Sequence, residues 1–181
     1  MGRTKPVVLV LVLGVLIAPS VGAPDAKKPA DVPERWTFRF DDRQWELGHQ
    51  AANRQEAIRE YVLAGQTVED WQELVTSHYF AHGVAPRNYF EQLKAGLSQG
   101  CPSLSISVLE ESEDNILFEW RHNGCQGFPA QHQVERATRS GTMTLVLSFV
   151  QKTNELAPEK RGAWLAILKD ASIQPTGGAK P

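Results

Sequence analysis

The sequence lacks the features that mark several large classes of protein. Its longest apolar run, from Val7 to Ala18, is shorter than the ~20 residues that a membrane-spanning helix needs. It contains no Gly-x-Ser-x-Gly elbow for a nucleophilic serine and no glycine-rich phosphate loop. Its formal net charge of −2 argues against the basic surface that a nucleic acid or an anionic membrane would require. We therefore expect no nucleic-acid partner and no stable membrane insertion.

The N-terminal segment has the pattern of a secretory signal peptide. Arg3 and Lys5 precede the apolar run, and the small residues Val21–Ala23 follow it at the spacing that signal peptidase recognises. We predict cleavage after Ala23, so that residues 1–23 are the signal peptide and the mature protein is periplasmic or secreted. The alternative is that the apolar run is retained as an N-terminal membrane anchor.

The chain has only two cysteines, Cys101 and Cys125. In an exported protein a disulfide is the default state of such a pair. The residues between them alternate in polarity on either side of a polar tip, which is typical of a β-hairpin. A hairpin that folds about Glu113 brings apolar side chains together on one face and also places Cys101 opposite Cys125. We predict a disulfide, because the alternative, a metal-binding or redox-active thiol pair, ordinarily has Cys-x-x-Cys spacing.

The rest of the chain reads as one domain between two irregular ends. Residues 24–35 contain three prolines and predict a flexible leader. Residues 36–173 carry the periodic apolar pattern of a folded domain, and residues 174–181 predict a disordered tail.

The periodicity within residues 36–173 alternates between strand and helix patterns. Residues 67–79 combine a capping box with apolar side chains at helical spacing, including Trp71, and predict a helix. A second helix is expected from Asn88 to a stop at Gly100, and a third from Pro158, with Trp164 on its apolar face. Strands are expected at 36–40, 45–47, 58–63, 104–110, 116–121, 133–139 and 142–150. The predicted class is α+β, a single antiparallel sheet with about three helices packed against it.

One segment resembles a family of small exported proteins of Gram-negative bacteria. The resemblance lies in residues 60–76, in Cys125 ahead of Glu135-Arg136, and in the late helix with Trp164, and it extends over most of residues 36–173. It implies export and a single domain, and it transfers no site residues because these proteins have no assigned activity. The order of strands and helices is also similar to the Mog1/PsbP type of α+β sandwich, at the level of fold alone.

Two histidines have the spacing of a metal-binding pair. His78 and His82 are four residues apart and would share one face of a continuing helix. The glutamate of the zinc-protease motif is missing, since Tyr79 and Phe80 follow His78. Two imidazoles supply half of a tetrahedral zinc site. We therefore expect no metal site and no cofactor.

Arginines suggest a charged surface. Arg35, Arg39, Arg136 and Arg139 would form a basic patch if the first strand and the penultimate hairpin were neighbours. Such a patch would suit an anionic ligand or an acidic partner. The alternative is scattered solubilising charge.

The absence of catalytic signatures makes a non-enzymatic binding or interaction module of the cell envelope our leading hypothesis, with an envelope protein or a small ligand as the partner. One alternative is a metal-assisted hydrolase that uses His78 and His82, and another is a periplasmic immunity or inhibitor protein. A deep pocket with converging polar groups would favour an enzyme. A flat apolar patch of a few hundred Å² would favour a protein partner.

Overall fold

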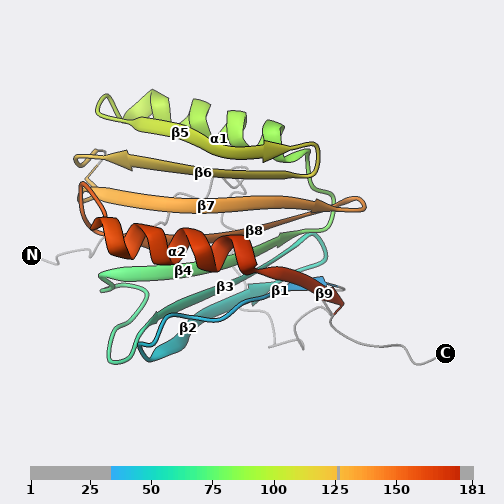
Figure 1. Cartoon of the computed structure of the whole chain (residues 1–181), viewed down its shortest axis with the longest axis horizontal. Coiled ribbons are helices and arrows are strands. Elements are labelled where there is room, and N and C mark those ends of the chain that lie inside the picture. The colour runs from blue at the N-terminus through green and yellow to red at the C-terminus, as the bar shows by residue number, and fades with distance from the viewer. Residues whose placement is uncertain (1–33, 126, 176–181) are drawn as a thin grey trace, which may run out of the picture.

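The computed structural model describes residues 34–125 and 127–175, which form a structure made mostly of β-sheet (Figure 1). The predicted signal peptide, the predicted leader up to residue 33 and the predicted tail from residue 176 lie outside the described residues. The elements, in chain order, are β1 (Glu34–Thr37), β2 (Trp45–Ala52), β3 (Glu56–Leu63), β4 (Glu73–Phe80), α1 (Pro86–Gly100), β5 (Ser105–Ser112), β6 (Asn115–His122), β7 (Gln131–Ser140), β8 (Met143–Gln151), α2 (Pro158–Asp170) and β9 (Ser172–Pro175).

The main sheet has seven antiparallel strands in the order β2-β3-β4-β8-β7-β6-β5. Two meanders, β2-β3-β4 and β5-β6-β7-β8, meet where β8 pairs with β4, and α1 connects them. A second sheet pairs β1 with β9. It therefore joins the start of the predicted domain to residues that the sequence assigns to the tail.

The predicted fold class is wrong. The described residues hold a seven-stranded antiparallel sheet, a two-stranded sheet and two helices, rather than one sheet with about three helices. The missing helix is the one expected over residues 67–79. Thr67 does act as a local cap, because its Oγ1 accepts a hydrogen bond from the Asp70 amide at 3.3 Å. The chain then bends and continues as strand β4.

Burial of β4 on both of its faces explains this error. Strand β4 lies in the middle of the main sheet, with β3 on one side and β8 on the other. Leu74 and Val75 are adjacent, point to opposite faces and are both buried. A strand buried on both faces loses its polar alternation and cannot be told from a buried helix by periodicity.

The predicted hairpins are confirmed. Ile106 pairs with Trp120 and Val108 with Phe118, as expected for a hairpin about Glu113. A disulfide joins Cys101 to Cys125. The pairing of β7 with β8 is also as predicted, and so are helices ending at Gly100 and beginning at Pro158.

The two helices lie on opposite faces of the main sheet. Helix α2 covers one face, where Trp164 stacks on Phe149 of β8 with ring centroids 4.2 Å apart. Helix α1 packs on the other face against β6 and β7, where Phe90 meets Phe118 edge to face at 5.0 Å. On this second face, β4 and β8 lie beside α1 rather than beneath it, and a cavity lies in the angle between them. In the described part of the chain, neither helix is long and apolar enough to span a membrane.

Candidate functional site

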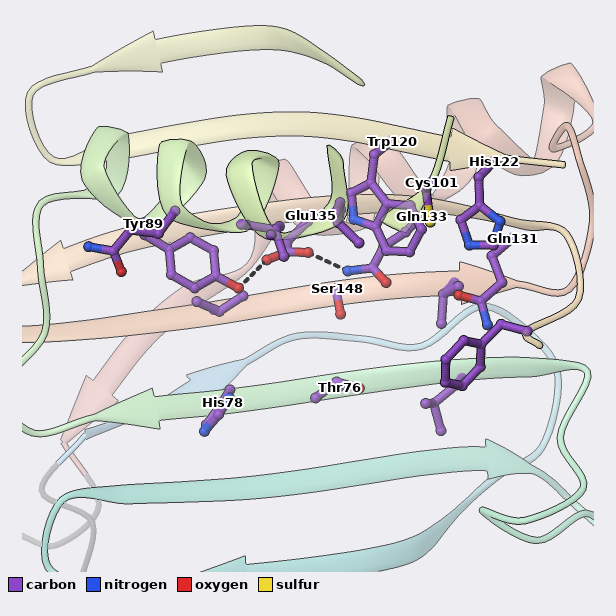
Figure 2. Close-up of a pocket in the computed structure, with 18 of the residues that line it drawn as sticks. Thr76, His78, Tyr89, Cys101, Trp120, His122, Gln131, Gln133, Glu135 and Ser148 are labelled. Atoms are coloured by element: carbon purple, nitrogen blue, oxygen red, sulfur yellow. Dashed lines mark hydrogen bonds between the residues drawn. The ribbon is translucent and has the colours of Figure 1, made fainter. Parts of the chain in front are cut away.

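The cavity of about 830 Å³ lies between α1 and the face of the main sheet formed by β4, β8, β7 and β6 (Figure 2). Its lining is mostly apolar and aromatic, but a row of polar side chains crosses its floor. Ser148 of β8 pairs in register with Thr76 of β4 on one side and with Glu135 of β7 on the other. Directly opposed residues share one face of a sheet. All three side chains therefore point into the cavity.

Glu135 is the most unusual member of this row, because its carboxyl is buried with only 2% of the residue exposed. The hydroxyl of Tyr89, on α1, donates a hydrogen bond to Oε1 at 2.6 Å, and the side-chain amide of Gln133 donates to Oε2. The indole N–H of Trp120 is turned toward the same carboxyl and helps to lower its pKa, but it completes no hydrogen bond (Figure 2).

Burial controls the protonation of this group. It raises the pKa of Glu135 to about 7, against the opposing effect of the donors Tyr89 and Gln133 and of the nearby Trp120 N–H. Burial, together with the neighbouring Glu135 carboxyl, also raises the pKa of the Tyr89 hydroxyl well above its usual value. Tyr89 is therefore a hydrogen-bond donor throughout the physiological pH range.

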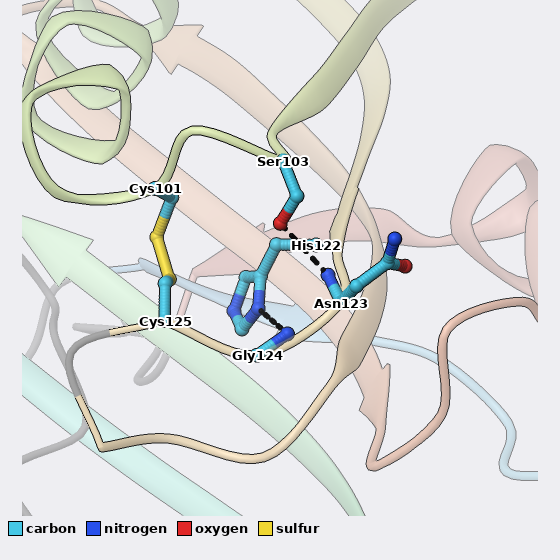
Figure 3. Close-up of a disulfide and its surroundings, with 6 residues drawn as sticks. All are labelled: Cys101, Ser103, His122, Asn123, Gly124 and Cys125. Carbon is cyan, nitrogen blue, oxygen red and sulfur yellow. Dashed lines mark hydrogen bonds between the residues drawn. A yellow bond between two sulfur atoms is a disulfide. The ribbon is translucent and has the colours of Figure 1, made fainter.

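His122 and the disulfide close one end of the cavity (Figure 3). The Gly124 amide donates to His122 Nδ1 at 3.0 Å, which leaves Nε2 to carry the proton of the neutral ring. Burial lowers the pKa of His122, so the neutral form is favoured. Gly124 has a φ of 98°, a conformation that favours glycine, and this turn brings Cys125 back to Cys101 at the end of α1.

The same end contains the one group of three potential metal ligands among the described residues. The ligand atoms of Cys101, His122 and Cys125 lie within 4.8 Å of one another. Zinc binds cysteine as the thiolate, and the disulfide leaves neither sulfur available in that form. In the oxidised protein these three residues therefore have a structural role at one end of the cavity.

The two predicted histidines do not form a pair on a helix. His78 is buried on β4 and faces the cavity, whereas His82 is exposed in the turn that follows. His78 Nε2 lies 3.4 Å from the Glu56 carboxylate, and burial lowers the pKa of His78 although Glu56 opposes this effect. Neither histidine belongs to a three-ligand group within the described ranges. The hydrolase alternative thus has no assembled metal shell.

Arg136 and Arg139, the two arginines of the predicted patch that lie on β7, contact different parts of the structure. Arg136 and Arg139 are three residues apart on a strand, so they point to opposite faces. Arg139 pairs with Asp114 at 2.7 Å on the hairpin tip. Arg39 is exposed, and the side chain of Arg35 lies outside the described part. Arg136 Nη1 donates to three backbone oxygens at the end of α2, namely those of Leu168, Lys169 and Ala171.

Comparison with known proteins gives a family. A family model matches residues 30–160. The chain belongs to this uncharacterised family. The matched range of the family contains α1 and the whole main sheet, so every residue that lines the cavity falls inside it. No curated protein and no solved structure matches the chain.

Sequence reasoning missed the central residues of the cavity, namely Tyr89, Gln133 and Glu135. A signal was present in β7, where Gln131, Gln133 and Glu135 occupy alternate positions and must share one face. Val134 shows that the other face of this strand is core. Polar side chains opposite a core face ordinarily indicate solvent. Only the position of α1 above them encloses them in a cavity.

Proposed function

We propose that the protein is an exported binding protein that holds a small molecule in the cavity between α1 and the main sheet. The observation that carries this proposal is a mostly apolar cavity with a few polar groups converging on its floor. Its volume, about 830 Å³, falls within the range of about 300–1,000 Å³ usual for small-molecule sites. Glu135, Ser148 and Thr76 would fix the orientation of the ligand, and the apolar walls would supply most of the affinity.

A small ligand fits the surface better than a protein partner does. Among the described residues, the exposed large apolar side chains are Leu47, on β2, and Val84, in the segment before α1. Each is a single side chain on a separate segment. A protein partner would call for a contiguous apolar patch of a few hundred Å².

Binding is also better supported than catalysis, although converging polar groups in a deep pocket fit an enzyme as well. Tyr89 and Gln133 both donate to Glu135, and His122 accepts from the backbone. In the part of the chain that the structure describes, Glu135 and His122 therefore already accept hydrogen bonds from protein donors, and neither is poised beside a nucleophile as its base. A covalent catalyst instead needs a nucleophile beside a free base.

Export is part of the proposal. The disulfide between Cys101 and Cys125 is compatible with an oxidising compartment. The signal-peptide pattern of residues 1–23 supports the same location.

Titration with N-phenylnaphthylamine, an uncharged dye that fluoresces in apolar sites, tests the proposal. Ser148→Phe would place a ring on the cavity floor, and we expect it to weaken dye binding about tenfold, equivalent to ~1.4 kcal/mol. Ser112→Phe is the matched control, because Ser112 is exposed at the end of β5 and remote from the cavity lining. Equal dye binding by both variants, each folded, would contradict binding in the cavity.

A further inference from the structure

We infer that the ligand is an organic cation with an apolar body, and that Glu135 is its counter-ion. This inference rests on the proposed function, since it assigns a chemical class to the molecule in the same cavity. Its basis is a buried carboxylate whose protein partners are all neutral.

The partners of Glu135 are an unusual set for a buried acid. Tyr89 and Gln133 are neutral donors, and within the described residues no lysine, arginine or histidine forms an ion pair with Glu135. A buried carboxylate is ordinarily paired with a cation, because removal of an unpaired charge from water is costly. Two donated hydrogen bonds also leave acceptor capacity on the two oxygens, which together offer about four lone-pair sites. Part of each oxygen therefore stays open to the cavity, and a positive charge placed there would supply the counter-ion that the protein itself does not provide.

The cationic side chain in the cavity lining is too far away to fill this role. Lys152 directly follows β8, and its Nζ lies 4.5 Å from the ring centroid of Trp71. Ser148 is the register partner of Glu135, and Lys152 is four residues farther along the chain. At about 3.3 Å per residue, that separation is about 13 Å. A ligand cation, by contrast, can reach Glu135 through the cavity.

Aromatic side chains around the cavity suit the same ligand. Trp120, Tyr89 and Phe128 are among its lining residues. Trp120 and Tyr89 both lie next to Glu135 (Figure 2). Aromatic faces attract ammonium groups, and the attraction is strongest where water is excluded. A carboxylate flanked by such rings matches a quaternary ammonium group attached to an apolar body.

Cation binding would displace the proton of Glu135, since its pKa of about 7 leaves about half of these carboxyls protonated at pH 7. The two buried histidines of the cavity would not obscure this effect, because burial lowers the pKa of His78 and of His122 and leaves both largely neutral at that pH. The titratable groups that line the cavity besides Glu135 are His78 and His82 at β4, Tyr89 on α1, His122 on β6 and Lys152 after β8.

Two probes of the same shape test the inference. Benzyltrimethylammonium carries the positive charge, and neopentylbenzene is its uncharged isostere. Both probes are measured by displacement of N-phenylnaphthylamine. We expect Glu135→Gln to weaken binding of the cation by about ten- to a hundredfold, as for loss of an interaction with a charged group. Binding of the neutral probe should not change. Glu113→Gln removes the same charge at the exposed hairpin tip and should alter neither probe.

Proton release provides a second measurement that uses the unmodified protein. Calorimetric titration with benzyltrimethylammonium in two buffers of different ionisation enthalpy should show release of about half a proton per ligand at pH 7. The inference is wrong if no proton is released, or if the Glu135→Gln variant binds the cation normally. Binding of the dye would still support the proposed function in that case. If neither the dye nor either probe binds, the proposed function fails with it.

Discussion

The hydroxyl of Tyr89 donates a 2.6 Å hydrogen bond to the carboxyl of Glu135, from α1 to β7 and across 46 residues of sequence. This bond ties the helix that forms one wall of the cavity to the polar row on its floor. Because Glu135 is buried and Tyr89 is half-buried, water cannot readily replace the bond between them. The position of α1 and the protonation of Glu135 are therefore linked.

Tyr89→Phe should lower the free energy of unfolding by about 1–3 kcal/mol, since it removes a donor from a buried carboxyl. Chemical denaturation at neutral pH measures this change. Tyr61→Phe is the matched control, because the Tyr61 side chain packs against Phe38 and Phe40 and its hydroxyl has no hydrogen bond among the described residues. Equal destabilisation by the two substitutions would mean that the bond to Glu135 contributes nothing specific.

Glu135→Gln should change the pH dependence of stability. The folded protein holds the Glu135 proton to a pKa of about 7, above the ordinary value of 4.5, so wild-type stability is lost as the pH rises through this interval. Glutamine is neutral throughout and does not suffer this loss. Between about pH 5 and about pH 8, the free energy of unfolding of the variant should therefore rise by on the order of 3 kcal/mol relative to that of the wild type.

Urea denaturation of both proteins at several pH values provides the comparison. Histidines with a lowered pKa, such as His122, make stability rise with pH, but they do so equally in both proteins. Parallel stability curves for wild type and Glu135→Gln would show that the Glu135 carboxyl titrates like an exposed one.

The disulfide should be essential to the closed end of the cavity. Reduction, or Cys125→Ser, opens a loop with a sequence separation of 24 residues and should cost about 3 kcal/mol in the chain-entropy model. Thermal unfolding with and without reductant measures this loss. Intact-mass analysis should find no alkylation of Cys101 or Cys125 before reduction, and ready alkylation without reductant would refute the bond.

Arg136 should be a structural residue rather than part of an anion-binding surface. It donates to three carbonyl oxygens at the end of α2 and to Asn115 at 2.6 Å. Arg136→Lys should cost about 1.5–3 kcal/mol, because lysine cannot reproduce the planar set of donors. Arg139→Lys alters a pair with exposed Asp114 and should cost less than about 1 kcal/mol. Equal costs measured by denaturation would remove the distinction between the two residues.

Local patterns predicted much of the fold. The β5–β6 register followed from the spacing of Cys101 and Cys125 around Glu113, and both of the observed helices begin or end close to expected signals. The failure at β4 has a physical cause. Burial of Leu74 and Val75 on opposite faces depends on α2 and on the cavity lining, which come from elsewhere in the chain.

The site was less predictable than the fold. The spacing of His78 and His82 suggests a pair on one helix face, but His78 lies on a strand, where that spacing has no such meaning. Tyr89 and Glu135 carry no common motif, and only the packing of α1 on β7 brings them together. A site assembled by tertiary contacts between distant segments leaves little periodic signal in the sequence.

The central claim is that a small molecule binds between α1 and the sheet. A backbone-amide NMR titration with N-phenylnaphthylamine tests it most directly, because it maps the contact residue by residue. We predict saturable shifts at Thr76, Ser148 and Glu135 and at the facing turns of α1, with little change along the outer face of α2. Shifts confined to α2 or to the hairpin tips, or no saturable shift, would contradict the account.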